Sequence, residues 1–201
     1  MDMTQLGIIV GVAIIGGLSA MAIMLKLHFP IAWVRKLTHV GGTTFIIVSA
    51  LLTNYKVFVI AGFIFAALIM LMRFIRPPKA LAKAETLYSF GESFFFIGVA
   101  LTALLADSTL HFVIPIAILG FADTAAYIVG RSIKSPTLIF SKTVAGSLAF
   151  VLVAFLLLLI VAPWWVAVIG AVVTGTAELV GLRGSDNVTV PVVAALLLTI
   201  A

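Results

Sequence analysis

The chain has 201 residues, of which 64% are hydrophobic and only 9% are charged, and its mean hydropathy is +1.34. These values lie far outside the range of soluble domains, and no soluble domain of ordinary size fits beside the apolar segments, so any chemistry must use membrane helices and their short loops. The absence of cysteine excludes disulfides, thiolate metal sites and cysteine nucleophiles.

The apolar runs predict an all-α fold, a polytopic transmembrane bundle of about 7–8 helices, in a single integral membrane domain over residues 1–201. The first run follows Asp2 without a positively charged leading segment, which indicates a retained helix rather than a cleaved signal peptide. The expected helices cover residues 5–25, 31–53, 57–73, 86–106, 109–130, 146–162, 164–182 and 188–201.

The loops between these helices carry the net charge of +5, a position more typical of membrane topology than of nucleic-acid binding, and we expect no nucleic-acid partner. When alternate loops are assigned to opposite sides, Lys56 stands alone on one side. By the positive-inside rule the other side is cytoplasmic and the amino terminus lies outside. The basic residues expected on the cytoplasmic side are Lys26, Arg35, Lys36, Arg73, Arg76, Lys79, Lys83, Arg131, Lys134, Lys142 and Arg183.

Four of the expected helices carry an ionisable residue near their cytoplasmic ends. Asp123 is expected about 10 Å from the end of its helix, Glu92 about two turns into its helix, and Glu178 about one turn from the end of the next-to-last helix. His39 lies near the start of the helix over 31–53. A charge in hydrocarbon costs roughly 2.5–3.5 kcal/mol, so such groups usually pair with each other or line a cavity.

Pairing is the simplest explanation for any one of these residues: Asp123 with Arg35, or Glu178 with Lys142. A lone His39 is also more often a structural histidine than a catalyst. As a group, however, carboxylates and basic residues open toward one compartment, which favours a ligand that is polyanionic and bound to a metal.

The segment "SKTVAGS" is expected to open a helix near Lys142 and Thr143. The amides at such a helix start and its positive dipole end favour phosphate, and Gly146 allows close approach. Ser141 and Pro136 stand where a Walker loop needs its glycines, so the segment is not that motif.

Gly120, Asp123, Tyr127 and Gly130 have spacings that place them on one helical face. The glycines there permit close approach of either a ligand or a neighbouring helix, and helix packing is the common reason for glycine in membrane helices.

Hard oxygen ligands from Asp and Glu suit Mg²⁺, which prefers few carboxylates together with substrate phosphates. Asp186 and Asn187 fall in the last cytoplasmic loop, where Asn187 could simply cap the final helix. Lys and Arg nearby would neutralise charge during phosphoryl transfer. The residues therefore predict a membrane enzyme that handles a Mg²⁺-nucleotide and a lipid acceptor.

From residue 33 onward the chain contains, in this order, "RKLTHVGG", "ETLYSFGE", "GFADTAAYIVGR", "SKTVAGSLA" and "AELVGLRGSDNVTVPVVAALLL". The ordered set resembles the family of CTP-dependent lipid kinases, which includes dolichol, phytol and farnesol kinases and the yeast-type diacylglycerol kinase. The resemblance implies transfer of the γ-phosphate of CTP to a membrane isoprenoid alcohol of the dolichol, polyprenol or phytol type, at a site that faces the cytoplasm. The sequence departs from the family pattern at Ala122, Ala145 and Ser185.

With this resemblance, Asp123 is expected to bind Mg²⁺, helped by Glu178 or Asp186. The expected contacts to the triphosphate are Lys142, Arg35 and Lys36. His39 or Glu92 would orient or deprotonate the lipid hydroxyl. Further expected contacts to the nucleotide are Thr143, Gly146, Ser147, Gly130 and Asn187. CTP and a lipid alcohol are the expected partners, and a second copy of the chain is a further candidate.

Two alternatives remain. "ADTAAY" followed by "SKT" is also similar to phosphatidate cytidylyltransferase, the CDP-diacylglycerol synthase, although the chain ends with the "DNVTVP" segment of the kinases. A carrier for an anionic lipid or nucleotide could use the same charges without turnover, but no inverted repeat is found in the sequence.

Overall fold

The computed structural model describes residues 23–24, 26–75 and 90–200. Across these ranges every regular element is a helix, beside one isolated β-bridge between Thr137 and Thr143. The prediction of an all-α chain is confirmed for this part of the protein. The chain forms two compact units, residues 1–53 and 54–201, and each is described by itself. The single domain expected over residues 1–201 stays a prediction.

The first unit contains α2 (Ile31–Leu52), a helix of 22 residues that begins directly after Pro30. Proline has a fixed φ suited to a helix start, which explains why the helix begins there. The predicted helix over 31–53 agrees with α2 to within one residue. The predicted helix over 5–25 lies almost entirely outside the described residues.

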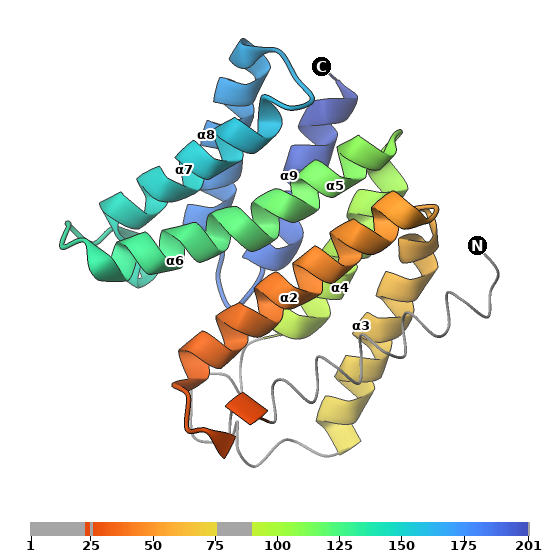
Figure 1. The fold of residues 1–201 in the computed structure, drawn as a ribbon, viewed down its shortest axis with the longest axis horizontal. Coiled ribbons are helices and arrows are strands. Elements are labelled where there is room, and N and C mark those ends of the chain that lie inside the picture. Colours follow the sequence, from red (N-terminus) through yellow and green to blue (C-terminus); the bar gives the residue numbers. More distant parts are fainter. Residues whose placement is uncertain (1–22, 25, 76–89, 201) are drawn as a thin grey trace. The chain divides into compact units, whose positions relative to one another are not determined.

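The second unit holds the remaining helices, which Figure 1 labels. In chain order they are α3 (Val57–Ile75), α4 (Gly91–Leu105), α5 (Thr109–Ala117), the π-helical turn η2 (Ile118–Ala122), α6 (Asp123–Ser132), the 3-10 turn η3 (Ile139–Ser141), α7 (Val144–Leu158), α8 (Trp164–Val180) and α9 (Asp186–Thr199). Each helix predicted in this unit is present, with ends that differ from the predicted ends by a few residues.

Local sequence sets several of these helix ends. Ser108 caps α5, because its side chain accepts a hydrogen bond from the His111 amide at 3.1 Å. Thr143 caps α7 in the same way, and Pro163 precedes α8. These caps fix where the chain turns, and thereby which residues stand at the helix starts.

The segments α5, η2 and α6 form one continuous helix of 24 residues, Thr109–Ser132. Pro115 lies inside it and cannot donate a backbone hydrogen bond. The amide of Ile118 is shared between the carbonyls of Ile114 and Pro115, and the π-helical turn follows immediately. A π-turn inserts an extra residue, which shifts the helical register just before Asp123.

Within the second unit, α3, α4, α9, α8, α7 and α6 each pack on the next in that order, and the α5–η2 segment packs against α4, α7 and α9 (Figure 1). The core lies along this segment, where Phe112, Ile116 and Leu119 are buried together with Phe150 and Leu158 of α7. This packing holds the start of α6 beside α7.

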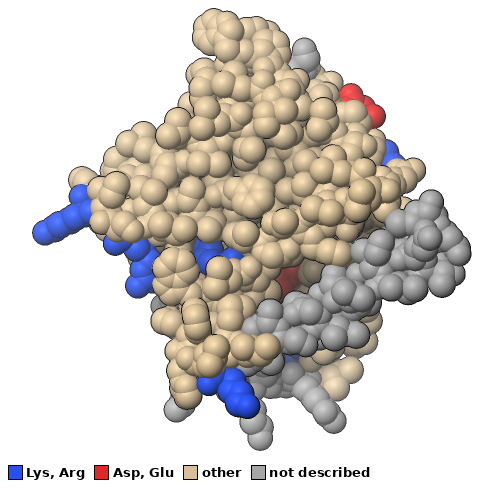
Figure 2. All heavy atoms as spheres, viewed as in Figure 1, with Lys and Arg blue, Asp and Glu red and all other residues tan. Residues whose placement is uncertain are grey.

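Among the described residues, two helices are long and apolar enough to cross a membrane: α3, with 19 residues, and the continuous helix Thr109–Ser132, with 24 residues. Along α3 many large apolar side chains are exposed, among them Ile60, Ile64, Leu68 and Met72. Figure 2 shows a face of the molecule on which few charged side chains are visible. Such a surface is suited to lipid rather than water.

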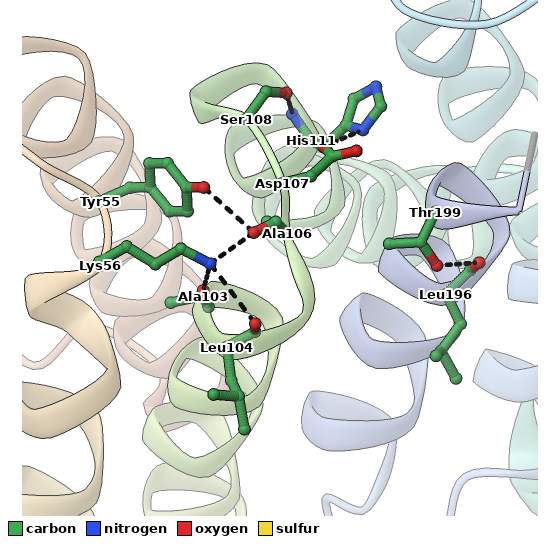
Figure 3. A network of polar contacts seen from close by, with 10 residues as sticks. All are labelled: Tyr55, Lys56, Ala103, Leu104, Ala106, Asp107, Ser108, His111, Leu196 and Thr199. Atoms are coloured by element: carbon green, nitrogen blue, oxygen red, sulfur yellow. Dashed lines mark hydrogen bonds and ion pairs between the residues drawn. The ribbon is translucent and has the colours of Figure 1, made fainter.

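A polar network stabilises the carboxyl end of α4 (Figure 3). The Lys56 ammonium donates to the carbonyl oxygens of Ala103 at 3.1 Å and Ala106 at 2.6 Å, and the Tyr55 hydroxyl donates to the Ala106 oxygen at 3.0 Å. Carbonyls at a helix end have no partner within the helix and carry partial negative charge, so a cation there is favourable. Lys56, expected from the sequence only as a loop residue, therefore caps α4.

Candidate functional site

The centre of the candidate site is an ion pair between Lys142 and Glu178. The Lys142 ammonium lies 2.8 Å from the Glu178 carboxylate oxygen Oε1 and also donates to the Glu178 backbone carbonyl. The Glu178 side chain is only 8% exposed and the Lys142 side chain 21%. The pairing considered for these two residues from the sequence is confirmed. It joins the start of α7 to the last turn of α8.

Two further carboxylates act on this pair. The negative charges of Asp123, at the start of α6, and Asp186, at the start of α9, both interact electrostatically with the Glu178 carboxylate. Glu178 is thus within electrostatic range of one ammonium and two other carboxylates, which come from three other parts of the second unit. We call Asp123, Glu178 and Asp186 the carboxylate cluster.

The carboxylate cluster is electrostatic rather than a preformed metal cage. Among the described residues, no group of three or more His, Asp or Glu side chains has an arrangement that could hold a metal ion. The donor chemistry of carboxylate oxygens still suits Mg²⁺, which commonly takes one or two carboxylates and completes its shell with phosphate and water.

Asp123 lies deeper in its helix than the sequence predicted. It is the first residue of the ten-residue α6, which runs past Gly130 to Ser132. Nine residues at helical rise put Asp123 about 14 Å from that end. The π-turn just before it occurs often at functional sites, because it re-aims the side chains that follow. The turn also disturbs the predicted common face of Gly120 and Asp123.

Gly130 and Gly146 allow α6 and α7 to cross closely. A Cβ atom at Gly130 would lie 2.8 Å from the Thr143 hydroxyl oxygen and 3.5 Å from Gly146 Cα. A Cβ atom at Gly146 would lie 2.8 Å from the Ala126 carbonyl oxygen. A contact under 3.0 Å requires the neighbour to shift, so both glycines serve helix packing, the alternative considered from the sequence. Their expected contact with a nucleotide stays a prediction.

The first amides of α7 are already hydrogen-bonded. Val144 donates to the Pro136 carbonyl at 3.0 Å, Ala145 to the Ser135 hydroxyl at 3.0 Å and Gly146 to the Thr143 hydroxyl at 3.2 Å. The prediction that these amides are open to phosphate is wrong, because the preceding loop folds back and satisfies them. Ser147 follows, and its buried hydroxyl has no hydrogen-bond partner among the described residues.

Asn187 connects two helix starts. Its side-chain amide donates to the Gly91 carbonyl oxygen at 2.8 Å, across 96 positions of sequence. The proposed role of Asn187 as an N-cap is wrong, since α9 begins at Asp186 and Ser185 stands at the cap position. The bond ties the first turn of α9 to the first turn of α4, and no sequence pattern pointed to it.

Glu92 is exposed in the first turn of α4 rather than two turns into a helix. A carboxylate at that place is favourable because it faces the positive end of the helix dipole. Its expected role toward a lipid hydroxyl stays a prediction.

Arg35, Lys36 and His39 all lie on α2, in the first unit. Arg35 is exposed, Lys36 is buried and His39 is half-buried. The helical spacing confirms the expected common face of Arg35 and His39. Their expected roles toward the triphosphate and the lipid stay predictions.

No family model, curated protein or solved structure matches this chain.

Proposed function

We propose that the protein is an integral membrane kinase that transfers the γ-phosphate of CTP to the hydroxyl of a membrane isoprenoid alcohol of the dolichol, polyprenol or phytol type. The observation that carries the proposal is the ion pair of Lys142 with Glu178, whose carboxylate is within electrostatic range of Asp123 and Asp186 on two further helices. An ammonium and carboxylates of this kind are able to neutralise a triphosphate and to hold its metal ion.

The proposed topology is a polytopic bundle with the amino terminus outside. It is supported by the two long apolar helices and by the gathering of basic residues in alternate loops. In this topology α6 and α8 end, and α4, α7 and α9 begin, at the cytoplasmic side. The carboxylate cluster would then be reached from the cytoplasm by the nucleotide and from the bilayer by the lipid.

Each residue of the site would have a separate role in binding the nucleotide or the metal. Lys142 would bind the phosphates and would exchange part of its contact with Glu178 for the nucleotide. Asp123, helped by Glu178 or Asp186, would hold Mg²⁺. When bound, the metal would offset the negative charge of the phosphates.

The acceptor hydroxyl must lose a proton as its oxygen attacks the γ-phosphorus. Glu92 is the candidate in the second unit to orient that hydroxyl and accept the proton, while CDP leaves with the oxygen that bridged the β- and γ-phosphates. Most of the rate enhancement in such a transfer comes from positioning and charge neutralisation.

The competing reaction is cytidylyl transfer to phosphatidic acid, which releases pyrophosphate and retains the α-phosphate in the lipid. The purified protein is given CTP labelled at the α- or the γ-phosphate, with either an isoprenoid alcohol or phosphatidic acid, and the lipid products are separated. We expect label from the γ-phosphate alone, in the phosphorylated alcohol. Label from the α-phosphate alone would overturn the kinase proposal, and binding without any labelled lipid would favour a carrier.

A matched pair of variants ties the reaction to the site. Asp123→Asn removes a carboxylate of the cluster and should abolish transfer. Asp107→Asn makes the same chemical change at an exposed residue that pairs with His111 at 2.6 Å near the other end of the helix Thr109–Ser132, and should leave transfer intact. Equal loss in both variants would contradict the assignment.

A further inference from the structure

The loop between α6 and α7, residues 133–143, exposes a tip of consecutive apolar side chains. Leu138, Ile139 and Phe140 are 41%, 45% and 54% exposed, and Ile133 at the start of the loop is exposed as well. Figure 1 shows this connection projecting beyond the ends of the two helices that it joins. Three adjacent large apolar residues at a projecting tip are unfavourable in water and need an apolar partner.

Backbone hydrogen bonds hold the tip in this position. Thr137 and Thr143 form the β-bridge, the Leu138 amide donates to the Lys142 carbonyl at 2.6 Å, and the Lys142 amide donates to the Ile139 carbonyl at 3.1 Å. The loop is therefore closed at its base and cannot fold its apolar residues inward.

Phe140 and Ser141 adopt left-handed backbone conformations, with φ of 54° and 63°. This conformation is unfavourable for a bulky side chain and is usually occupied by glycine or asparagine. The Phe140 side chain is 54% exposed despite this unfavourable backbone, so much of its apolar surface is left for an interaction outside the loop.

The charge around the tip indicates what that interaction is. Residues 131–143 contain Arg131, Lys134 and Lys142 but no Asp or Glu. Lys142 is paired with Glu178. Arg131 and Lys134 are exposed, and Arg131 also donates a hydrogen bond to the Tyr127 hydroxyl at 2.8 Å. An apolar tip beside exposed cations matches the boundary of a bilayer leaflet, where acyl chains meet anionic headgroups.

The neighbouring helices place the tip at such a boundary. The loop follows the 24-residue apolar helix Thr109–Ser132 and leads into α7. On α7, Leu148, Leu152 and Leu156 recur every four residues and are all exposed, which forms an outward apolar stripe.

We propose that the loop 133–143 is a membrane-surface anchor. Leu138, Ile139 and Phe140 insert into the leaflet at which α6 ends, and Arg131 and Lys134 bind the phosphates of anionic lipids. The inference rests on the membrane placement in the proposed function, but it does not depend on the reaction. Because Lys142 closes the same loop, the anchor fixes the height of its ammonium relative to the leaflet, where a lipid hydroxyl must reach a nucleotide.

The absence of cysteine allows a clean test on the full chain. A spin label is attached to Phe140→Cys, and separately to Ile139→Cys in case the first variant does not fold. The control label is on Asn54→Cys, at an exposed residue between α2 and α3. The proteins are reconstituted in vesicles of phosphatidylcholine alone or with phosphatidylglycerol, and label depth is measured from its accessibility to oxygen and to a water-soluble nickel complex.

We expect the labels at 139 and 140 to be more accessible to oxygen than to nickel, and the label at 54 to show the reverse. One basic residue near an anionic surface contributes about 1 kcal/mol to membrane binding, which is about fivefold in the ratio of inserted to exposed label. Lys134→Gln should therefore lower this ratio about fivefold in vesicles that contain phosphatidylglycerol, and should leave it unchanged in phosphatidylcholine alone. A label at 140 as accessible to nickel as the label at 54 would overturn the anchor. Insertion that is equal in both lipids would overturn the role of anionic headgroups.

Two other results distinguish the membrane anchor from a protein contact and from the proposed reaction. A label at 140 that is shielded from both reagents in detergent as well as in vesicles would mean that protein, not lipid, covers the tip, which contradicts the anchor. Insertion of the label without transfer of γ-phosphate would support the anchor and contradict the proposed reaction.

Discussion

Replacement of Lys142 by methionine tests whether the ion pair with Glu178 supports the fold of the second unit. The change keeps the length of the side chain but leaves the Glu178 carboxylate buried, within electrostatic range of Asp123 and Asp186, without the ammonium 2.8 Å away. Removal of one partner from a buried pair costs about 3–5 kcal/mol. The Lys142 side chain is 21% exposed, so water can screen the remaining charge and about 2–3 kcal/mol is expected.

The measurement is thermal unfolding in detergent, followed by circular dichroism, of Lys142→Met, Glu178→Gln and the double variant. A loss of about 2–3 kcal/mol corresponds to a fall in Tm of roughly 4–12 °C for a chain of this size. The double variant should be more stable than the sum of the single effects predicts, by about 2 kcal/mol, because neither charge is then left unpaired.

The matched control is Lys134→Met, which removes an exposed lysine from the same loop and should change the free energy of unfolding by less than about 0.5 kcal/mol. Strictly additive single effects, or equal losses in Lys142→Met and Lys134→Met, would refute the ion pair as a stabilising contact.

Three further changes probe other parts of the structure. Gly146→Ala places a methyl group 2.8 Å from the Ala126 carbonyl and should lower the free energy of unfolding by about 1–3 kcal/mol in chemical denaturation, whereas Gly41→Ala, where nothing among the described residues lies within 4 Å, should be neutral or stabilising. Lys56→Met removes the cap of α4 and should cost about 1 kcal/mol in the same assay while transfer of γ-phosphate is kept; a loss of transfer at unchanged Tm would contradict the structural role. Ser141→Gly relieves a left-handed conformation and should raise Tm slightly, and a marked fall in Tm would show that φ at this position is not 63° in solution.

The helices of the second unit could be predicted because long apolar runs, prolines and capping residues act locally. Thr143 and Pro163 mark the starts of α7 and α8 in the sequence itself. The pairing of Lys142 with Glu178 could also be predicted, because a carboxylate near the end of an apolar helix requires a cation and Lys142 precedes a helix that begins on the same predicted side of the membrane.

The parts that could not be predicted depend on tertiary geometry. The hydrogen bond from Asn187 to Gly91 joins residues 96 positions apart, and no local sequence pattern predicts it. The amides of α7 are satisfied by Ser135 and Pro136 because the loop folds back, which spacing alone does not reveal. The depth of Asp123 was underestimated because α6 continues past Gly130 to Ser132, and the π-turn before Asp123 could not be predicted from residue spacing.

The most direct test of the proposed reaction is a time course of phosphate transfer by the purified protein from γ-labelled CTP to an isoprenoid alcohol in mixed micelles with Mg²⁺. We expect phosphorylated alcohol to accumulate with the wild-type chain and not with Asp123→Asn. Absence of labelled alcohol from a wild-type protein that binds CTP, or equal accumulation with both proteins, would contradict the kinase and its site.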